Sequence, residues 1–347
     1  MRKANLVPLE DALPIRENTG VPYASQKTFT DEDGNKHPVM HACGHDMHVT
    51  SLLGAADLLK QTSSSWSGTL ICLLQPNEEN GRGAQAMVND GLFERIPKPD
   101  ICLAQHCFPL RTGNVAIRPG PCMSAADSFN VTIYGHGGHG SRPESCIDPI
   151  VIASYIIVRL QSIVSRVIAP QDAAVVTCGS IHGGSAHNII PNEVNFKLNI
   201  RTYSESVRKK VLQSLHKIIE CECEAAGSPR KPDIVRTHEY PLTSNDEEAA
   251  ATVRKAFEAH FGHERVETMD PCSASEDFAH LAIPNGTPYA FWFLGATDTN
   301  QYDEAVRNDT VGQLPGLHTE KFVPSLESTL QTGVQALAVA ALTYLMK

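Results

Sequence analysis

The sequence lacks an excess of basic residues, and this absence excludes one large class of function. Among its 347 residues, 39 are Asp or Glu and 29 are Lys or Arg, so the formal net charge is −10. Proteins that bind nucleic acids need clustered Lys and Arg side chains to neutralise phosphates. We therefore expect no nucleic-acid partner for this acidic chain.

The sequence also lacks long hydrophobic runs, internal repeats and low-complexity segments. Its longest apolar stretch, residues 334–346, is too short to span a bilayer and is interrupted by Gln335 and Thr343. The opening MRKANLVPLEDALPI has a basic start but no apolar core of a signal peptide. We therefore expect a globular protein with no membrane partner, in which residues 334–346 belong to a buried terminal helix.

Ten cysteines are present, but their placement does not suggest a set of disulfides. Cys72, Cys102 and Cys178 lie in apolar runs typical of strands, where a free thiol packs as a small hydrophobic group. Cys221 and Cys223 lie on one expected helix. Scattered cysteines in a chain of this size indicate a reducing compartment, so we expect a cytoplasmic protein.

Alternating strand-like and helix-like segments in the first part of the chain predict an α/β domain. Apolar residues have helical spacing over 48–60 and 83–89, and short apolar runs at 69–74 and 101–105 are typical of buried strands. This rhythm predicts a mostly parallel sheet with flanking helices. The same alternation of helix-like and strand-like segments returns near the end of the chain, with a helix over 246–261, a strand over 289–294 and a helix over 325–345.

The middle of the chain has a different pattern, which predicts an inserted domain. Apolar residues alternate with polar ones over 129–133 and 194–200, as expected for strands with one exposed face. The remaining expected elements are amphipathic helices over 149–167 and 207–219 and a strand over 175–181. We therefore predict an α+β domain over 122–242, inserted into a first domain made of 1–121 and 243–347.

Several short segments carry side chains that bind metals or move protons. Thiolate and imidazole are good ligands for zinc and similar divalent ions. Of two adjacent carboxylates, one can bind a metal while the other takes a proton from water. The candidates are Cys43 and His45 in MHACGHDMH, Glu78 and Glu79 in QPNEENG, His106 in AQHCFP, His136 and His139 in GHGGHGSRP, and His318 in LPGLHTEKF.

The expected placement of these residues makes a metal site plausible without establishing it. Glu78, Glu79 and His106 should follow the carboxyl ends of parallel strands, where open α/β sheets place their sites. Each residue alone also has an ordinary structural explanation. Cys43 would serve as a small buried residue, and the two glutamates would serve as a solvated pair at a helix start.

Taken together, the motifs resemble the M20 peptidase family, in particular the amidohydrolases that include hippurate hydrolase, N-acyl-amino-acid hydrolases and plant auxin-conjugate hydrolases. The resemblance runs from about Asp11 to the end of the chain. The matching stretches occur in family order: DALPIRENTGVPYAS, MHACGHDMHVTSLLGAADLL, LLQPNEENGRGAQAMVNDGLF, GHGGHGSRPESCIDP, HNIIPNEV, SASEDFA and GLHTEKF.

The resemblance implies a metal-dependent hydrolase that cuts the amide bond of N-acyl or aryl-acyl amino acids. It implies one or two divalent ions, zinc or manganese, and an inserted lid or dimerisation domain whose open sheet edge makes a homodimer plausible. It gives Glu78 the role of general base and Asp11 that of orienting the metal site. The implied metal ligands are Cys43, His45, Glu79, His106 and His318, and the implied substrate-binding residues are His139, near the oxyanion, and Asn188 and Arg201, near the substrate carboxylate or a dimer contact.

The sequence departs from the family pattern at its start and in one motif. The chain begins just before the DALP segment and has Leu9 where a carboxylate is expected, so we expect an N-terminally truncated product. NEENG replaces the commoner Ala-Glu-Glu-Gly, which puts Asn77 into the turn before the two glutamates. Two alternatives stay open: a non-catalytic relic that binds metal and dimerises, or a dipeptidase or aminoacylase of another M20 branch.

Overall fold

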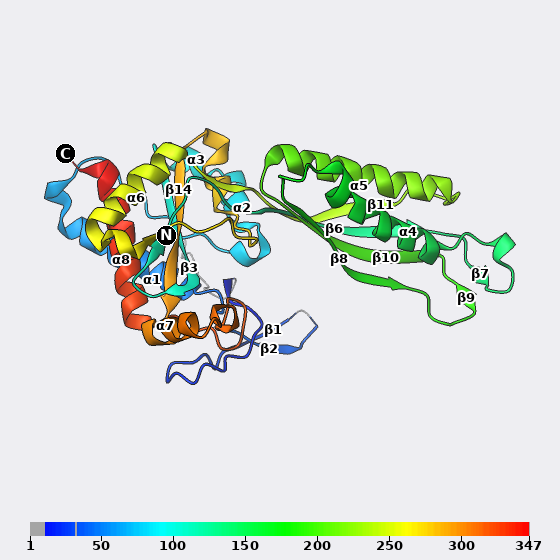
Figure 1. The fold of residues 1–347 in the computed structure, drawn as a ribbon, viewed down its shortest axis with the longest axis horizontal. Coiled ribbons are helices and arrows are strands. Elements are labelled where there is room, and N and C mark those ends of the chain that lie inside the picture. The colour runs from blue at the N-terminus through cyan, green and yellow to red at the C-terminus, as the bar shows by residue number, and fades with distance from the viewer. Residues whose placement is uncertain (1–10, 32, 347) are drawn as a thin grey trace. The chain divides into compact units, whose positions relative to one another are not determined.

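The computed structural model describes residues 11–31 and 33–346, which form two compact units (Figure 1). Unit 1 consists of the described parts of 1–122, 244–270 and 277–347, and unit 2 consists of 123–243 and 271–276. Leu9 lies outside the described residues. The roles expected for the two domains, catalytic and lid or dimerisation, remain predictions.

Unit 1 is built on a sheet with the strand order β13–β4–β14–β3. The long strands β3 (Cys102–Arg111) and β14 (Tyr289–Thr297) pair in parallel, as do the short strands β4 (Val115–Ala116) and β13 (Val266–Glu267). Only the short contact between β4 and β14 is antiparallel. The predicted α/β class with a mostly parallel sheet is therefore confirmed.

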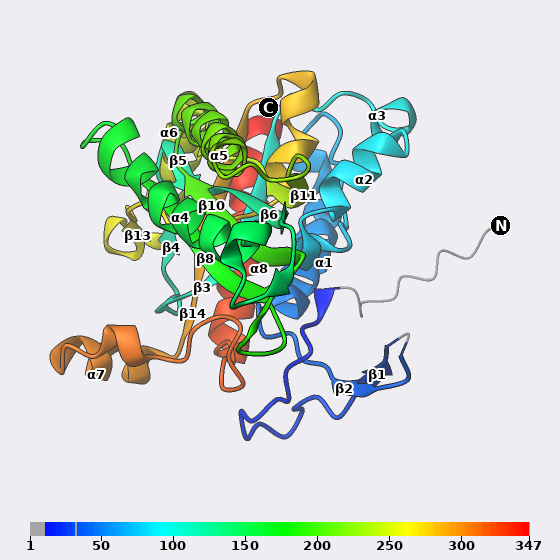
Figure 2. The same ribbon diagram turned by 90° about the vertical axis from the view of Figure 1, so that its right-hand side faces the viewer.

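Three long helices pack against this sheet and against one another (Figures 1 and 2). They are α1 (His45–Gln61), α6 (Glu247–Phe261) and α8 (Leu326–Leu345). Every residue of β14 is buried, and its Trp292 is fully buried in a core that also contains Phe257 of α6. The remaining elements of unit 1 are the hairpin β1 (Thr28–Thr30) and β2 (Lys36–Pro38), α2 (Gly83–Asn89), α3 (Leu92–Arg95) and α7 (Thr299–Arg307).

Two local predictions about unit 1 were wrong. Residues 69–74 form no strand, and Leu74 is 37% exposed, because no ladder in the described residues pairs with this segment. The strand expected to end at Gln105 continues to Arg111, because the parallel register with β14 runs on past that point. His106 therefore lies inside a strand, opposite Phe293, and not after its carboxyl end.

Unit 2 is an α+β layer with one face of its sheet left open. Its antiparallel sheet has the order β11 (Asp233–Tyr240), β6 (Ala125–Tyr134), β10 (Glu193–Thr202) and β8 (Ala174–Gly183). Helices α4 (Pro149–Ser162) and α5 (Glu205–Ala225) cover one face (Figure 2). Exposed and buried side chains alternate along the first half of β10, since one face meets the helices and the other meets solvent. The short strands β7 (Gly138–His139) and β9 (Ile189–Ile190) of unit 2 pair with each other. The strands β5 (Gly120–Met123) and β12 (Thr243–Asn245), which lie mostly in unit 1, form a second short pair.

The α4 segment has apolar residues on both of its faces. By length and composition, Pro149–Val167 is the single helical segment of the described residues that could cross a membrane. One face nevertheless packs into the core through Ile152, Ile156 and Leu160, as a core helix does. The expected amphipathic helix over 149–167 changes to a π-helix at Ile163–Val167. Its outer face exposes apolar residues such as Tyr155 and Val158 beside polar ones such as Arg159.

Candidate metal centre

The five predicted metal ligands, which are dispersed in the sequence, meet within unit 1. The Cys43 Sγ lies 3.5 Å from the His106 Nε2 and 3.2 Å from the His318 Nε2. The His318 Nε2 lies 3.3 Å from Oε2 of Glu79. The third histidine of the cluster, His45, has its Nε2 3.9 Å from Oε1 of Glu79. The structure thus brings together every side chain that the resemblance implied as a ligand.

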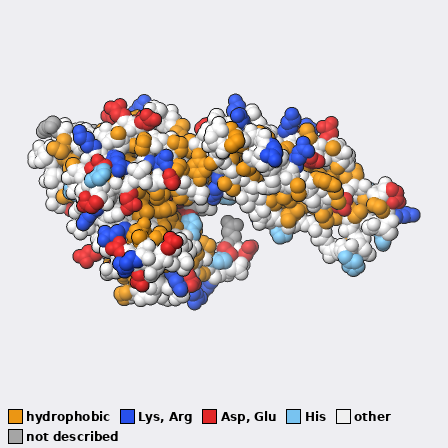
Figure 3. Space-filling model, viewed as in Figure 1, with side chains coloured by type: hydrophobic (Ala, Val, Ile, Leu, Met, Phe, Trp, Pro, Cys, Tyr) orange, Lys and Arg blue, Asp and Glu red, His pale blue; other side chains and the backbone are white. Residues whose placement is uncertain are grey.

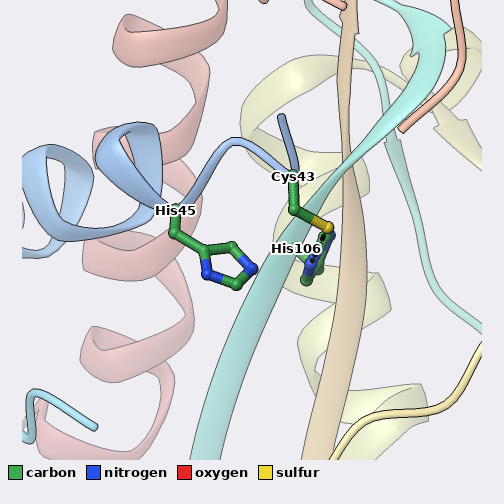
Figure 4. Close-up of side chains that lie close together, drawn as sticks. All are labelled: Cys43, His45 and His106. Carbon is green, nitrogen blue, oxygen red and sulfur yellow. Dashed lines mark hydrogen bonds between the residues drawn. The ribbon is translucent and has the colours of Figure 1, made fainter. Parts of the chain in front are cut away.

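A tight turn before α1 positions two of these side chains (Figure 4). Gly44, the residue between Cys43 and His45, has a φ of 77°, in the left-handed region that glycine adopts without strain. A Cβ atom at Gly44 would lie 3.0 Å from the Cβ of Cys107, so the turn also lacks room for a side chain. The close approach presents Cys43 and His45 toward His106 on β3.

The two glutamates lie on a short 3₁₀ turn, Glu78–Asn80, between two left-handed residues. Asn77 has a φ of 59°, a conformation that asparagine tolerates better than most residues because its side chain bonds locally. Here Oδ1 of Asn77 accepts a hydrogen bond of 2.6 Å from Nδ2 of Asn80. The departure from the commoner family motif is thus accommodated by the turn itself.

His318 also has a left-handed backbone, with a φ of 62°. Its N–H donates a hydrogen bond of 2.8 Å to the carbonyl oxygen of Ala42, the residue before Cys43. Such conformations in non-glycine residues are costly and concentrate at functional sites. This bond fixes the loop before α8 against the turn before α1.

Burial keeps two histidines of the cluster uncharged, which is the form that binds a metal. Burial, and after it the proximity of His106, lower the pKa of His45 to about 3. Burial likewise lowers the pKa of His106. Burial acts to raise the pKa of Glu79, but its hydrogen bond with His318 and the charge of that ring prevail, and the net shift is downward. The site therefore offers neutral imidazoles beside an ionised carboxylate.

The donor atoms fit a divalent ion in number, type and spacing. Zinc bonds of about 2.0 to 2.3 Å in tetrahedral geometry place neighbouring ligand atoms roughly 3.3 to 3.8 Å apart, close to the distances found here. Three triads each have donor atoms within 4.8 Å of one another. Cys43, His45 and Glu79 each belong to two of them. The six side chains of the three triads together supply enough donors for one or two ions. The triads are Cys43 with His45 and His106, Cys43 with Glu79 and His318, and His45 with Glu78 and Glu79.

Glu78 and Asp11, the residues predicted for proton transfer and for orientation, lie beside this cluster. Oε2 of Glu78 is 3.7 Å from the His45 Nε2. Oδ1 of Asp11 accepts a hydrogen bond of 2.6 Å from the backbone N–H of Glu78. Burial raises the pKa of Asp11, while its hydrogen bonds with the Glu78 and Glu79 backbone act to lower it. The contact ties Asp11 to the turn that carries both glutamates.

Sequence reasoning missed His48, which supports His106 from behind. Its Nε2 accepts a hydrogen bond of 2.8 Å from the N–H of Cys107. The ring centroids of His48 and His106 lie 4.5 Å apart. The carbonyl of Cys107 in turn accepts a bond of 2.7 Å from Nδ1 of His106. Both backbone polar groups of Cys107 are therefore hydrogen-bonded, which leaves Nε2 of His106 to face Cys43. The signal in the sequence was the spacing of three between His45 and His48, which puts both on one helical face.

Unit 2 carries the remaining predicted residues, and it brings two of them together. His139 pairs with Ile189 in the β7–β9 ladder, next to Asn188, whose carbonyl accepts the N–H of Gly140 at 2.8 Å. Arg201 lies near the far end of β10, eight residues beyond Glu193, or roughly 26 Å along a strand. Its guanidinium donates to the carbonyl of Ser273 and to Oγ of Ser275. The structure does not place Arg201 beside His139.

A family model decides which family this chain belongs to. The model for peptidase family M20/M25/M40 matches residues 10–342. The chain belongs to this family. Among its M20 relatives, an N-acetyl-L-cysteine deacetylase of Bacillus subtilis is 40% identical over 287 residues, which are 82% of this chain and 64% of the relative. A hippurate hydrolase of Campylobacter jejuni is 38% identical over 283 residues, 81% of this chain and 70% of the relative.

Solved structures agree with this assignment. A candidate aminohydrolase of methicillin-resistant Staphylococcus aureus has a TM-score of 0.80 and 31% identity, covering 96% of this chain and 79% of the other. The YXEP protein of Bacillus subtilis, a dinuclear metal-binding peptidase of the M20 family, has a TM-score of 0.71 and 26% identity, covering 95% and 78%. The predicted family is confirmed.

Proposed function

We propose that this M20 member hydrolyses the amide bond of N-acyl or aryl-acyl amino acids in a metal-dependent reaction with Glu78 as general base. The observation that carries the proposal is the convergence of five dispersed metal-type ligands beside Glu78 in unit 1. The relatives support the substrate class, because one is named for deacetylating N-acetyl-cysteine and another for hydrolysing hippurate, an aryl-acyl amino acid.

The ligand set described above would hold one or two divalent ions, with zinc or manganese as the candidates. Such an ion would polarise the amide carbonyl and would make a nearby water more acidic. Glu78 lies beside the cluster and receives the proton of the attacking water, then delivers it to the leaving amine nitrogen. Asp11 holds the backbone of Glu78 in place through the 2.6 Å hydrogen bond.

His139 is suited to stabilise the oxyanion that forms during attack. Its Nδ1 accepts the backbone N–H of Ser141 at 3.2 Å and lies 2.7 Å from the hydroxyl of that residue. An Nδ1 that accepts a hydrogen bond is unprotonated, so the neutral ring carries its proton on Nε2. This tautomer presents an N–H donor, the group that an oxyanion needs. Asn188, on the adjacent strand end, is our candidate for the substrate carboxylate, and Arg201 retains its predicted role there or at a dimer contact.

Unit 2 is also our candidate for a homodimer contact, with a second copy of the chain as the occupant. Its ten-residue strand β8 is an edge of the described sheet, and the neighbouring outer face of α4 exposes Tyr155 at 66% and Val158 at 71%. Figure 3 shows hydrophobic side chains gathered over this part of unit 2. An antiparallel edge is self-complementary under two-fold symmetry, so two copies would pair their free backbone groups and bury the apolar face together.

The test of the activity compares a panel of N-acyl amino acids with a panel of dipeptides. Protein loaded with zinc or manganese should release free amine from N-acetyl-cysteine, hippurate or indole-3-acetyl amino acids with a higher kcat/KM than from dipeptides. Glu78→Gln should lower kcat by about 10²- to 10⁴-fold while metal binding persists. The matched control is Glu94→Gln, the same change on exposed α3.

Three outcomes contradict the proposal in different ways. Turnover by Glu78→Gln at the wild-type rate would remove the assigned base. A preference for dipeptides would move the chain to another M20 branch. A folded, metal-loaded protein that cleaves no member of either panel would favour the non-catalytic alternative.

A further inference from the structure

One buried carboxylate outside the ligand set holds both ends of the loop that carries Glu78 and Glu79. Asp277 is fully buried. Its Oδ1 accepts a hydrogen bond from the Gln75 side-chain amide, and its Oδ2 accepts the backbone N–H of Ala84 at 3.0 Å. Gln75 precedes the two glutamates and Ala84 follows them, so one side chain bridges the two flanks of the turn.

The two segments that Asp277 bridges, on either side of the Glu78–Glu79 turn, are in close contact. The N–H of Gly83 donates to the carbonyl of Asn77 at 3.2 Å. A Cβ atom on Gly83 would lie 1.6 Å from the carbonyl oxygen of Pro76, so no other residue fits there without moving the backbone. Residues 75–84 therefore form a closed loop, and Asp277 lies at its neck.

The carboxylate of Asp277 is directed to this loop and not to its own segment. Asp277 is the N-cap residue of the 3₁₀ turn Phe278–Leu281, yet its side chain makes no capping bond to that turn. It accepts an N–H of the first turn of α2 instead. The turn and α2 also pack together. A fully buried carboxylate is costly unless it is hydrogen-bonded. Here the hydrogen bonds connect Asp277 to residues that precede it by 202 and 193 positions in the chain.

We propose that Asp277 is a positioning residue that fixes the Glu78–Glu79 turn in the geometry needed for metal binding and proton transfer. The proposal rests on the function proposed above for those two glutamates. Asp277 lies in the SASEDFA motif, to which the sequence analysis assigned no role. A misplacement of about 1 Å at a reacting group can cost about 10²-fold in rate, so a clamp at the neck of this loop has a direct effect on turnover.

A charge exchange between the two partners tests this clamp. Gln75→Glu places a second carboxylate against Asp277 in a buried site, which should open the neck by repulsion. Adding Asp277→Asn should restore it, because Oδ1 of the asparagine accepts from Ala84 while its amide donates to the new carboxylate. We expect Gln75→Glu to lower kcat by about 10²-fold and metal affinity by about 10-fold, and the double variant to recover most of both losses.

Amide hydrogen exchange over residues 75–84 supplies a readout that does not depend on turnover. In the metal-free protein, exchange of this segment should accelerate by about 10-fold or more in Gln75→Glu and return toward the wild-type rate in the double variant. Gln85→Glu, the same change on the neighbouring exposed pair with Asn89, is the matched control and should leave exchange unchanged.

Two results would overturn the clamp: wild-type exchange in Gln75→Glu, or a double variant as impaired as the single one. If Gln75→Glu does not fold, Asp277→Ala and Asp277→Asn are compared instead. Alanine removes both hydrogen-bond acceptors without adding charge, whereas asparagine keeps one, so the alanine variant should be the more impaired. If the wild-type protein cleaves no substrate, the proposed function fails, but exchange and metal affinity still decide whether Asp277 positions the loop.

Discussion

The His318 Nε2 lies 3.2 Å from the Cys43 Sγ, although 275 positions separate the two residues in the sequence. This contact closes the cluster between the turn before α1 and the loop before α8. Cys43, like His45 and Glu79, belongs to two of the three ligand triads of this cluster, whereas His318 belongs to one. The two residues should therefore differ in what their removal does to metal binding.

Cys43→Ala should reduce metal content more than His318→Ala does. Loss of the shared thiolate weakens both triads, and we expect the metal affinity to fall by about 10²-fold or more. His318→Ala leaves Cys43, His45 and His106 in place and should retain one ion of a two-ion site. Metal per chain, measured after dialysis against a weak chelator, checks this order. Cys72→Ala, which alters an exposed free cysteine, is the control, and equal metal content in both ligand variants would refute the shared role of Cys43.

The sequence could predict the ligands because their signals are local, whereas their geometry depends on tertiary pairing. Cys43 and His45 occur in one short motif, and the helix predicted over 83–89 is found as α2 with the same bounds. The strand that carries His106 was predicted to end too early, because its last residues are fixed by the register with β14. Asp277 could not be assigned, because its partners Gln75 and Ala84 are close only in the folded chain.

Replacing Asp11 should slow turnover without changing substrate affinity. Asp11→Asn keeps an acceptor for the Glu78 N–H but loses the charge, and we expect kcat to fall by about 10-fold. Asp11→Ala removes the acceptor and should cost about 10²-fold, because the base is no longer held in place. KM should stay near the wild-type value in both. A rise in KM at constant kcat would instead place Asp11 in ground-state substrate binding.

His48 should affect stability and metal affinity together. In His48→Leu the N–H of Cys107 loses its acceptor, which costs about 1–3 kcal/mol in the free energy of unfolding. The Cys107 peptide that orients His106 is then freed, so metal affinity should fall by about 10-fold. His48→Gln retains a side-chain acceptor and should lose less of both. Denaturant unfolding of the metal-free protein gives the free energy of unfolding, and a chelator competition gives the metal affinity. A His48→Leu protein with unchanged metal affinity would limit His48 to a packing role.

The metal-free protein should lose stability as the pH falls from about 6.5 toward 3. Burial lowers the pKa of His45 to about 3 in the folded state, against an ordinary value of 6.5. Between these values the unfolded chain binds a proton at this position and the folded chain does not, so protonation favours unfolding. The loss from His45 alone should be on the order of 4 kcal/mol by pH 3. Urea unfolding of wild type and His45→Gln across this range checks the sign, since the variant should show a shallower decline.

Val158→Glu should convert a dimer of this protein into monomers. Val158 is 71% exposed on the outer face of α4, and a charge at the centre of an apolar contact would have to be desolvated on association. The control is Val306→Glu, which changes a 54% exposed valine on α7 in unit 1 and should leave the dimer intact. Light scattering coupled to size-exclusion chromatography, at micromolar concentration, gives the mass of each species. A wild-type protein that elutes as a monomer, or a Val158→Glu protein that stays dimeric, would exclude this face as the contact. Dissociation by Val158→Glu alone would assign the contact to the α4 face of unit 2, because the added charge is the same in both variants.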